Sequence, residues 1–194
     1  MKKKKELQLP NQEQLKQELK RELHKYRYAS VLRSTTNTLV VVAAFAILVA
    51  TLWIPVLQIY GNSMSPTLQE GQIVISVKNS EFKQGDLVAF YIGNKLLVKR
   101  VIAGPGDWIS ITEDGTVYIN DEELDEPYVN EKALGQTDLV YPYQVPESRY
   151  FLMGDHRESS VDSRSSAVGC VSEEQIVGRI VFCVWPFENF GAID

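Results

Sequence analysis

The sequence predicts a mainly β protein, in which an antiparallel β-sheet domain follows one N-terminal transmembrane helix. Two features of the chain lead to this prediction. Residues 39–57 form a long apolar run without a charged side chain, and a helix needs about 20 such residues to cross a bilayer. Residues 58–194 contain short runs of Val, Ile, Tyr and Phe separated by Gly, Asn, Asp and Pro, which is typical of strands joined by tight turns.

The apolar run is interpreted as a permanent membrane anchor at residues 38–57. A removable signal peptide is the alternative, but its apolar core is only about 7 to 15 residues long and follows a short basic segment. Here the apolar run is longer and starts almost forty residues into the chain. Both differences favour an anchor.

Charge predicts how the anchor is oriented. Residues 1–38 carry ten Lys or Arg and four Glu, whereas residues 39–194 carry ten Lys or Arg and 21 Asp or Glu. Because basic residues concentrate on the cytoplasmic side of membrane spans, we expect a basic cytoplasmic arm at residues 1–37. The domain at residues 58–194 is then expected outside the cytoplasm.

Within the basic arm, apolar side chains recur at helical spacing, at Leu15, Leu19, Leu23 and Tyr26. This spacing predicts an amphipathic helix next to the membrane. Two interpretations stay open for it: binding to anionic lipid or to a partner, and a solvated arm that only sets the topology.

The outer domain is predicted to consist of short strands. The candidate strands are residues 72–77, 86–92, 96–102, 108–112, 116–120 and 178–184. Asp114 and Gly115 lie between two of them and favour a type I′ hairpin turn. Residues 122–144 are acidic and contain proline, and they are predicted to form an irregular surface excursion with at most one short strand.

The two cysteines, Cys170 and Cys183, both lie in the outer domain, where disulfides persist. A bond between them and two free buried thiols are equally consistent with the sequence. The outer domain has one histidine and no ligand-spaced pair, so neither a metal site nor a cofactor is expected.

Ser63, a candidate nucleophile, lies only six residues beyond the apolar run. Six residues reach at most ~20 Å, so chemistry at Ser63 would take place at the membrane surface. A serine hydroxyl becomes a good nucleophile when a neighbouring base takes its proton. His24 lies in the basic arm, on the other side of the membrane, and is excluded as that base.

Two bases remain for this serine. His156 would need a carboxylate such as Asp155 or Glu158 to orient its ring. Lys99 lies in a largely apolar candidate strand, where burial would lower its pKa as a general base requires. Spacing alone leaves open whether Lys99 is such a base or a strand-edge lysine that extends to water.

Four segments, in this order behind the apolar run, resemble the type I signal peptidases: SMSPTL (63–68), GDLVAF (85–90), KRVIAGPGD (99–107) and GDHRESSVDSR (154–164). The resemblance covers essentially the whole outer domain. It implies a β fold like that of these peptidases and of LexA-like repressors. It also implies a membrane-bound serine endopeptidase in a bacterial cell (plasma) membrane that removes signal peptides from exported preproteins.

The resemblance also implies roles for individual residues. Ser63 corresponds to the acylating nucleophile and Lys99 to the general base. Ser160 corresponds to the serine that hydrogen-bonds the lysine amine and orients it. Asp162 and Arg164 correspond to a structural ion pair near the site, where a bidentate contact would hold the loop rigid.

Other positions qualify the resemblance. Met64 is similar to the residue whose backbone helps to position the lysine and whose side chain packs beside the site. Gly61 stands where some members have a serine that completes the oxyanion hole, so the backbone N–H of the nucleophile is expected to supply this function, together with water. His156, Glu158 and Ser159 replace more usual asparagine and aspartate residues and leave the catalytic positions unchanged.

The resemblance implies that substrate binds as an extended strand and is cut after small residues in an Ala-x-Ala-like pattern. Apolar side chains next to the two catalytic positions are the candidates for the substrate pockets: Ile59, Leu68, Leu97 and Val98. The expected partners are signal-peptide-bearing preproteins and the lipid bilayer, and no nucleic acid.

Two alternatives to a signal peptidase were weighed. A self-cleaving LexA-like repressor shares the Ser-Lys pair, but the place of its DNA-binding head is taken here by a membrane span, and no basic recognition helix is visible. An inactive membrane-tethered homologue that binds peptides is disfavoured because Ser63, Lys99 and Ser160 occur together.

Overall fold

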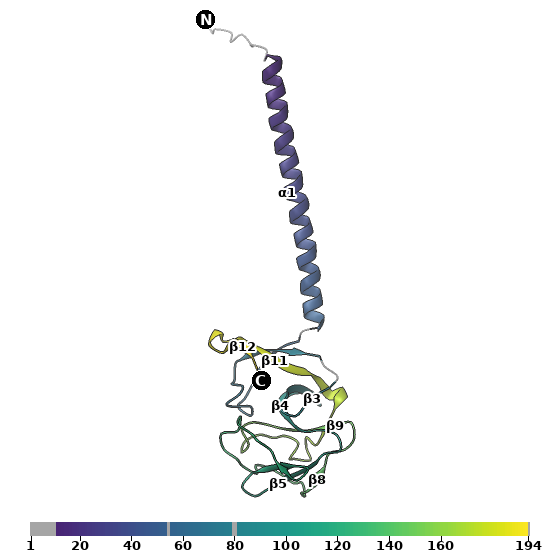
Figure 1. The fold of residues 1–194 in the computed structure, drawn as a ribbon, viewed down its shortest axis with the longest axis vertical. Helices are drawn as coiled ribbons and strands as arrows, with labels where there is room; N and C mark the ends of the chain where they lie inside the picture. Colours follow the sequence, from purple (N-terminus) through teal and green to yellow (C-terminus); the bar gives the residue numbers. More distant parts are fainter. Residues whose placement is uncertain (1–10, 54, 79–80, 194) are drawn as a thin grey trace. The chain divides into compact units, whose positions relative to one another are not determined.

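The structure is a computed structural model that describes residues 11–53, 55–78 and 81–193. The chain divides into two compact units, Met1–Thr51 and Leu52–Asp194. Among the described residues, the first unit is helical and the second consists mainly of strands and loops, with two short 3₁₀ helices (Figure 1).

Helix α1 runs without interruption from Gln12 to Trp53. It contains one segment that is long and apolar enough to cross a membrane. The helix includes the described part of the basic arm, where Leu15, Leu19 and Leu23 are exposed on one face. The described part of the arm is therefore helical from Gln12 onward, and its amphipathic, cytoplasmic role stays a prediction.

The helix ends earlier than the predicted span of residues 38–57. Val56 and Leu57 belong instead to strand β1 (Val56–Gln58), which pairs with β2 (Ile73–Val77). Pro55 explains why the helix does not continue, because proline has no N–H for a helical hydrogen bond. The last two residues of the predicted span therefore lie in a strand, and the bounds of the membrane-spanning segment itself stay a prediction.

The larger sheet of the second unit has eight strands. Its order is β1, β2, β11 (Ile176–Trp185), β3 (Leu87–Ile92), β4 (Lys95–Ala103), β9 (Arg149–Met153) and β10 (Val171–Ser172), and β12 (Gly191–Ala192) pairs with β11. Every described pair is antiparallel. The predicted mainly β, antiparallel fold is confirmed.

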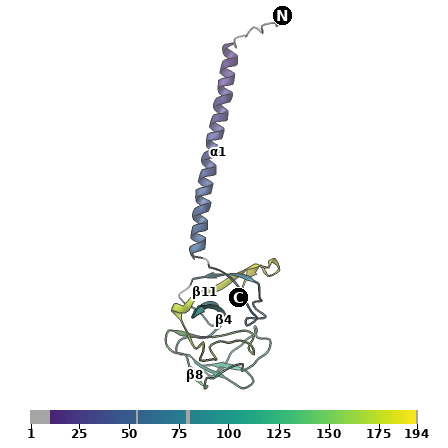
Figure 2. The same cartoon turned by 180° about the vertical axis from the view of Figure 1, so that it is seen from behind.

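A second sheet has four strands, in the order β7 (Glu122–Glu123), β6 (Val117–Ile119), β5 (Trp108–Ile111) and β8 (Tyr143–Gln144). Its strands β5 and β8 lie at the opposite end of the unit from β11 in both views (Figure 1 and Figure 2). Two 3₁₀ helices, η1 (Glu173–Gln175) and η2 (Phe187–Asn189), flank β11 in the sequence.

The hairpin between β5 and β6 exists, but its predicted type I′ turn does not. The Gly115 N–H donates to the Thr112 carbonyl at 2.9 Å, and the Thr112 N–H donates to the Thr116 carbonyl at 3.0 Å. Of the turn residues only Gly115 has a positive φ, at 87°. This is a three-residue loop with a bulge, which needs one left-handed residue where type I′ needs two.

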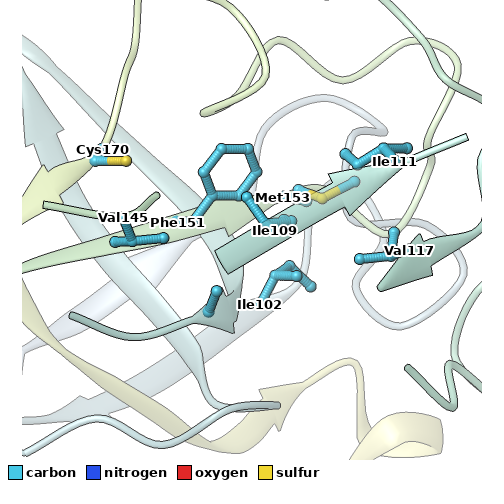
Figure 3. Packing of buried hydrophobic residues seen from close by; sticks show 9 residues of the cluster. Ile102, Ile109, Ile111, Val117, Val145, Phe151, Met153 and Cys170 are labelled. Atoms are coloured by element: carbon cyan, nitrogen blue, oxygen red, sulfur yellow. The ribbon is translucent and has the colours of Figure 1, made fainter. Parts of the chain in front are cut away.

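One apolar cluster joins the two sheets. Ile102, Phe151 and Met153 come from the larger sheet, and Ile109 and Val117 come from the smaller one. Figure 3 shows these side chains with the other labelled members of the cluster. The packing fixes β4, which carries Lys99, against the smaller sheet.

The segment between β7 and β8 belongs to the folded body more than the sequence suggests. We call residues 122–144 the strap. Leu124, Leu134, Leu139 and Tyr141 of the strap pack against the cluster around Phe151. The prediction of a surface excursion was wrong in this respect, because these apolar residues are too widely spaced to form a recognisable strand or helix pattern.

Both cysteines are free and buried. Cys170 packs in the cluster that joins the sheets, whereas Cys183 packs in the cluster that includes Met64 and Leu68. The alternative of a disulfide between them is therefore excluded in this structure, and each thiol acts as a small apolar core residue.

Candidate active site

Ser63 lies in a loop that is fastened at both ends. The Ile59 N–H donates to the Gln72 carbonyl at 2.8 Å, and the Leu68 N–H donates to the Met64 carbonyl at 2.8 Å. The side chains of Ile59, Met64 and Leu68 are buried in one apolar cluster. Ser63 itself stays partly exposed, so the loop presents its hydroxyl from a fixed base.

Lys99 reaches this hydroxyl from strand β4. Its Nζ lies 2.5 Å from Ser63 Oγ, although the two residues are 36 positions apart in the sequence. Lys99 is 3% exposed, and burial lowers its pKa to about 8. The carboxylates of Asp162 and Asp155 act in the opposite direction and the Arg164 guanidinium in the same one.

The geometry of this pair suits proton transfer. A lysine with a pKa near 8 is partly neutral close to physiological pH, and a neutral amine accepts a proton at hydrogen-bond distance. The structure therefore brings together the two residues that the sequence singled out as nucleophile and base.

Ser160 lies beside the Ser63 loop, but it does not make the hydrogen bond that was expected of it. Its hydroxyl is buried and has no hydrogen-bond partner among the residues that the structure describes, so the expected bond to the Lys99 amine is not formed here. Its backbone N–H donates to the His156 carbonyl at 3.2 Å. A buried hydroxyl without a partner is uncommon, and Ser76 is the other such case in the described residues.

Gly154 was not predicted as a site residue, yet it lies at the centre of the site. A Cβ at this position would collide with the Ser160 side chain and with the Ser63 carbonyl oxygen. That carbonyl also accepts a hydrogen bond from the His156 N–H at 3.1 Å. The glycine allows the loop of residues 154–164 to pack directly against the nucleophile.

Asp162 and Arg164 form the expected ion pair. Arg164 Nε and Nη2 donate to the two carboxylate oxygens at 2.8 and 2.9 Å, and both side chains are completely buried. The same carboxylate accepts the Gly154 N–H at 2.9 Å. A bidentate pair of this kind fixes geometry as well as charge.

A second buried ion pair connects the nucleophile loop to the strand of the base. Arg100 Nε and Nη2 donate to Asp155 Oδ1 and Oδ2 at 2.9 and 2.8 Å. The Thr67 hydroxyl donates to Asp155 Oδ2 at 2.5 Å, and Arg100 Nη1 donates to the Gly85 carbonyl at 2.8 Å.

A third buried pair joins Arg157 to Glu126 of the strap, with both side chains completely buried. Sequence reasoning missed Arg100, Arg157 and Glu126. The partners are 31 and 55 residues apart, so no local pattern connects them. The sequence signal that could have identified Arg100 and Arg157 is that they lie in two of the segments that carry the resemblance.

The arrangement does not support the Ser-His-Asp alternative. The His156 ring contacts Ser159 through Nδ1 at 2.8 Å, and only its backbone N–H reaches Ser63. The Asp155 carboxylate, which would have to orient the ring, is instead bonded to Arg100.

Of the four candidate pocket residues, two are buried in the core and two, Leu97 and Val98, are partly buried. Ile59 and Leu68 are buried below the nucleophile loop, and Val98 packs against the same cluster. Leu97 packs against a different cluster, because successive residues of a strand point to opposite faces. A role for them in binding substrate stays a prediction.

Comparisons with known proteins identify the family of the chain. Residues 32–185 match the family model described as "Signal peptidase, peptidase S26". A signal peptidase I of Bacillus licheniformis is 33% identical over 81% of this chain and 91% of its own length. A signal peptidase IB of Staphylococcus aureus strain Mu50 is 38% identical over 68% of this chain and 78% of its own length.

Among solved structures, a signal peptidase I from Enterococcus faecalis V583 is 28% identical, with a TM-score of 0.43 over 51% of this chain and 96% of that one. The match to the family model covers most of the sequence, and the relative from Bacillus licheniformis aligns over nearly its full length. The chain therefore belongs to the signal peptidase family, peptidase S26, whose members are serine endopeptidases.

Proposed function

We propose that this chain removes N-terminal signal peptides from exported preproteins through an acyl-enzyme on Ser63, with Lys99 as the general base. The observation that carries the proposal is the 2.5 Å distance between Lys99 Nζ and Ser63 Oγ, at a lysine whose pKa is lowered by burial. Membership of the signal peptidase family supports the same reaction.

The reaction would proceed in two steps. Neutral Lys99 takes the Ser63 hydroxyl proton while Oγ bonds to the scissile carbonyl carbon, and the resulting ammonium gives that proton to the leaving amine as the C–N bond breaks. Lys99 then takes a proton from water as the water oxygen bonds to the ester carbon, and it returns this proton to Ser63 Oγ as the ester C–O bond breaks, which releases the new carboxyl end and restores the Ser63 hydroxyl and the neutral lysine.

The negative charge on the substrate oxygen needs a donor. Among the described residues no acceptor takes the Ser63 N–H, which is therefore available to the developing oxyanion. Gly61, two residues earlier, has a φ of +80° and no side chain that could add a second donor. Water would complete the hole.

Ser160 and Met64 are proposed to support the base. A hydrogen bond with the Lys99 amine would satisfy the buried Ser160 hydroxyl, whose hydrogen-bonding capacity is unused in the described structure. Met64 is 2% exposed and packs in the cluster below the loop. This packing would keep the neighbouring Ser63 in position.

Location and specificity complete the proposal. Residues 1–37 form a cytoplasmic arm, residues 38–57 include the single membrane span, and residues 58–194 act outside a bacterial cell membrane. A preprotein whose signal segment is still in the bilayer would present its small, Ala-x-Ala-like residues to Ser63 at that surface, as an extended strand.

The test compares the full chain in detergent with its Ser63→Ala variant on a preprotein. Wild type should release the mature protein with a new N-terminus after a small residue, and Ser63→Ala should release none. Equal cleavage by the two proteins would refute the proposed nucleophile.

A further inference from the structure

The strap contacts all three arginines that are buried in the described residues. Tyr128 lies over Arg100, Glu126 pairs with Arg157, and the carbonyls of Ala133 and Leu134 accept hydrogen bonds from Arg164 at 3.3 and 2.8 Å. None of the reacting groups comes from the strap. It nevertheless contacts each of the three buried arginines. We call these arginines and their carboxylate partners Asp155, Glu126 and Asp162 the frame.

Tyr128 contacts Arg100 through its ring face. The Arg100 Cζ lies 3.9 Å from the ring centroid, which is a close cation–π geometry. The Tyr128 hydroxyl donates to Glu126 Oε1 at 3.2 Å. Burial and the nearby Glu126 carboxylate raise the Tyr128 pKa, so the phenol stays neutral and continues to donate.

Arg100 follows the general base Lys99 in β4. It pairs with Asp155, whose negative charge acts on Lys99. Its guanidinium neutralises Asp155 through two hydrogen bonds. The charged groups that act on Lys99 are Asp155 and Asp162, which favour the ammonium, and Arg164, which opposes it. A displaced Arg100 would leave the Asp155 charge less balanced.

Glu126 acts on the turn beside the nucleophile. Its carboxylate receives Nη1 and Nη2 of Arg157, and Arg157 Nε donates to the Gly154 carbonyl at 3.2 Å. Gly154 is the residue that packs against the Ser63 carbonyl.

We propose that the strap residues Tyr128 and Glu126 are positioning residues of the active site, because they hold Arg100 and Arg157 and, through them, the turn at Gly154. The inference rests on the proposed function and extends it to residues outside the segments that carry the Ser-Lys pair.

The decisive variant is Tyr128→Leu in the full chain, assayed on a preprotein across a pH series. Loss of the aromatic face releases Arg100, and the less balanced Asp155 charge then raises the Lys99 pKa. We expect kcat at pH 7 to fall about fivefold, the size of one cation–π contact. KM should stay unchanged, and the rise of kcat with pH should move to higher pH.

Three control variants separate positioning from general destabilisation. Tyr128→Phe and Tyr128→Trp keep an aromatic face over Arg100 and should keep the wild-type pH profile. Tyr118→Leu makes the same change as the test variant in β6 of the four-stranded sheet, opposite Ser110 and Glu123, and should also keep it. Thermal unfolding in the same detergent is recorded for each protein.

Glu126→Gln tests the second contact. Glutamine keeps one acceptor for Arg157 but removes the negative charge, so kcat should fall while KM stays unchanged. If this variant does not fold, the Tyr128 series still decides the inference.

Several results would overturn the inference. These are an unchanged kcat and pH profile in Tyr128→Leu, failure of Tyr128→Phe to restore activity, or a loss that follows the unfolding temperature alone. If wild type itself shows no Ser63-dependent cleavage, the proposed function fails instead, and the two failures are distinguished within the same experiment.

Discussion

The active site holds two kinds of buried cation in opposite ways. Arg100, Arg157 and Arg164 each have a carboxylate partner, whereas Lys99 has a hydroxyl, and within the described residues no carboxylate lies at ion-pair distance from its Nζ. An arginine stays charged when buried and needs a counter-charge, while an unpaired lysine loses its proton more easily. The same burial thus produces rigid cations in the frame and a titratable base at its centre.

The largest expected effect comes from replacing Lys99 by arginine, the residue that carries the positive charge in the three buried ion pairs. Lys99→Arg should lower the rate of preprotein cleavage by about 10⁴-fold, because a guanidinium cannot act as a base near neutral pH. Single-turnover cleavage measures the loss. A variant that keeps even a tenth of the wild-type rate would contradict the role of Lys99.

The second prediction removes the arginine of one buried ion pair. Arg164→Met leaves the Asp162 carboxylate buried without its partner, and the free energy of unfolding should fall by about 3–5 kcal/mol. The matched control is Arg179→Met, because the exposed Arg179–Asp86 pair should contribute about 1 kcal/mol or less. Urea unfolding of both variants in detergent compares them, and equal losses would show that burial is not the cause.

Gly154 tests the contact between the frame and the reacting groups. Gly154→Ala should lower kcat by about 10²-fold, since the added methyl displaces the Ser160 side chain or the Ser63 carbonyl, and small misplacements have effects of this size. Gly191→Ala is the control, because open space surrounds that position. Steady-state kinetics on a preprotein distinguishes the two, and a fully active Gly154→Ala would refute the close approach.

The last comparison concerns pH and stability. Because burial lowers the Lys99 pKa from 10.5 to about 8, the wild-type chain must bury an ammonium below pH 8. Lys99→Met should therefore be more stable at pH 7 by about 3 kcal/mol. The difference should shrink between pH 8 and 10.5, where the folded lysine is already neutral and the unfolded one is still charged.

Thermal unfolding of wild type and Lys99→Met at several pH values checks this sign. The activity of wild type should rise through about pH 8 in the same window, as the base becomes neutral. A stability difference that grows from pH 8 to 10.5 would contradict a lowered lysine pKa.

The sheet was the most predictable part of the molecule. β3 is a continuous apolar run and β4 is a largely apolar one, and each has glycine-containing turns at its ends, so their type and approximate bounds follow from local sequence. The hairpin at Gly115 was found but its turn was wrong. A three-residue loop and a two-residue loop share the same Asp-Gly signal.

The catalytic pair was identified by resemblance rather than by pattern. Neither Ser63 nor Lys99 has a spacing that distinguishes it from an ordinary surface residue. The three arginine–carboxylate pairs were less accessible still. Only the Asp162–Arg164 pair is local, and it was predicted; the other two join segments whose proximity exists only after folding.

The two free cysteines have a consequence for where the catalytic unit can fold. Burial raises the pKa of the Cys170 thiol, so the nucleophilic thiolate is scarce at neutral pH, and no bond in the described core depends on an oxidant. The redox state of the surroundings is then irrelevant to both the fold and the Ser-Lys chemistry. We expect equal activity and equal unfolding temperature in reducing and oxidising buffers.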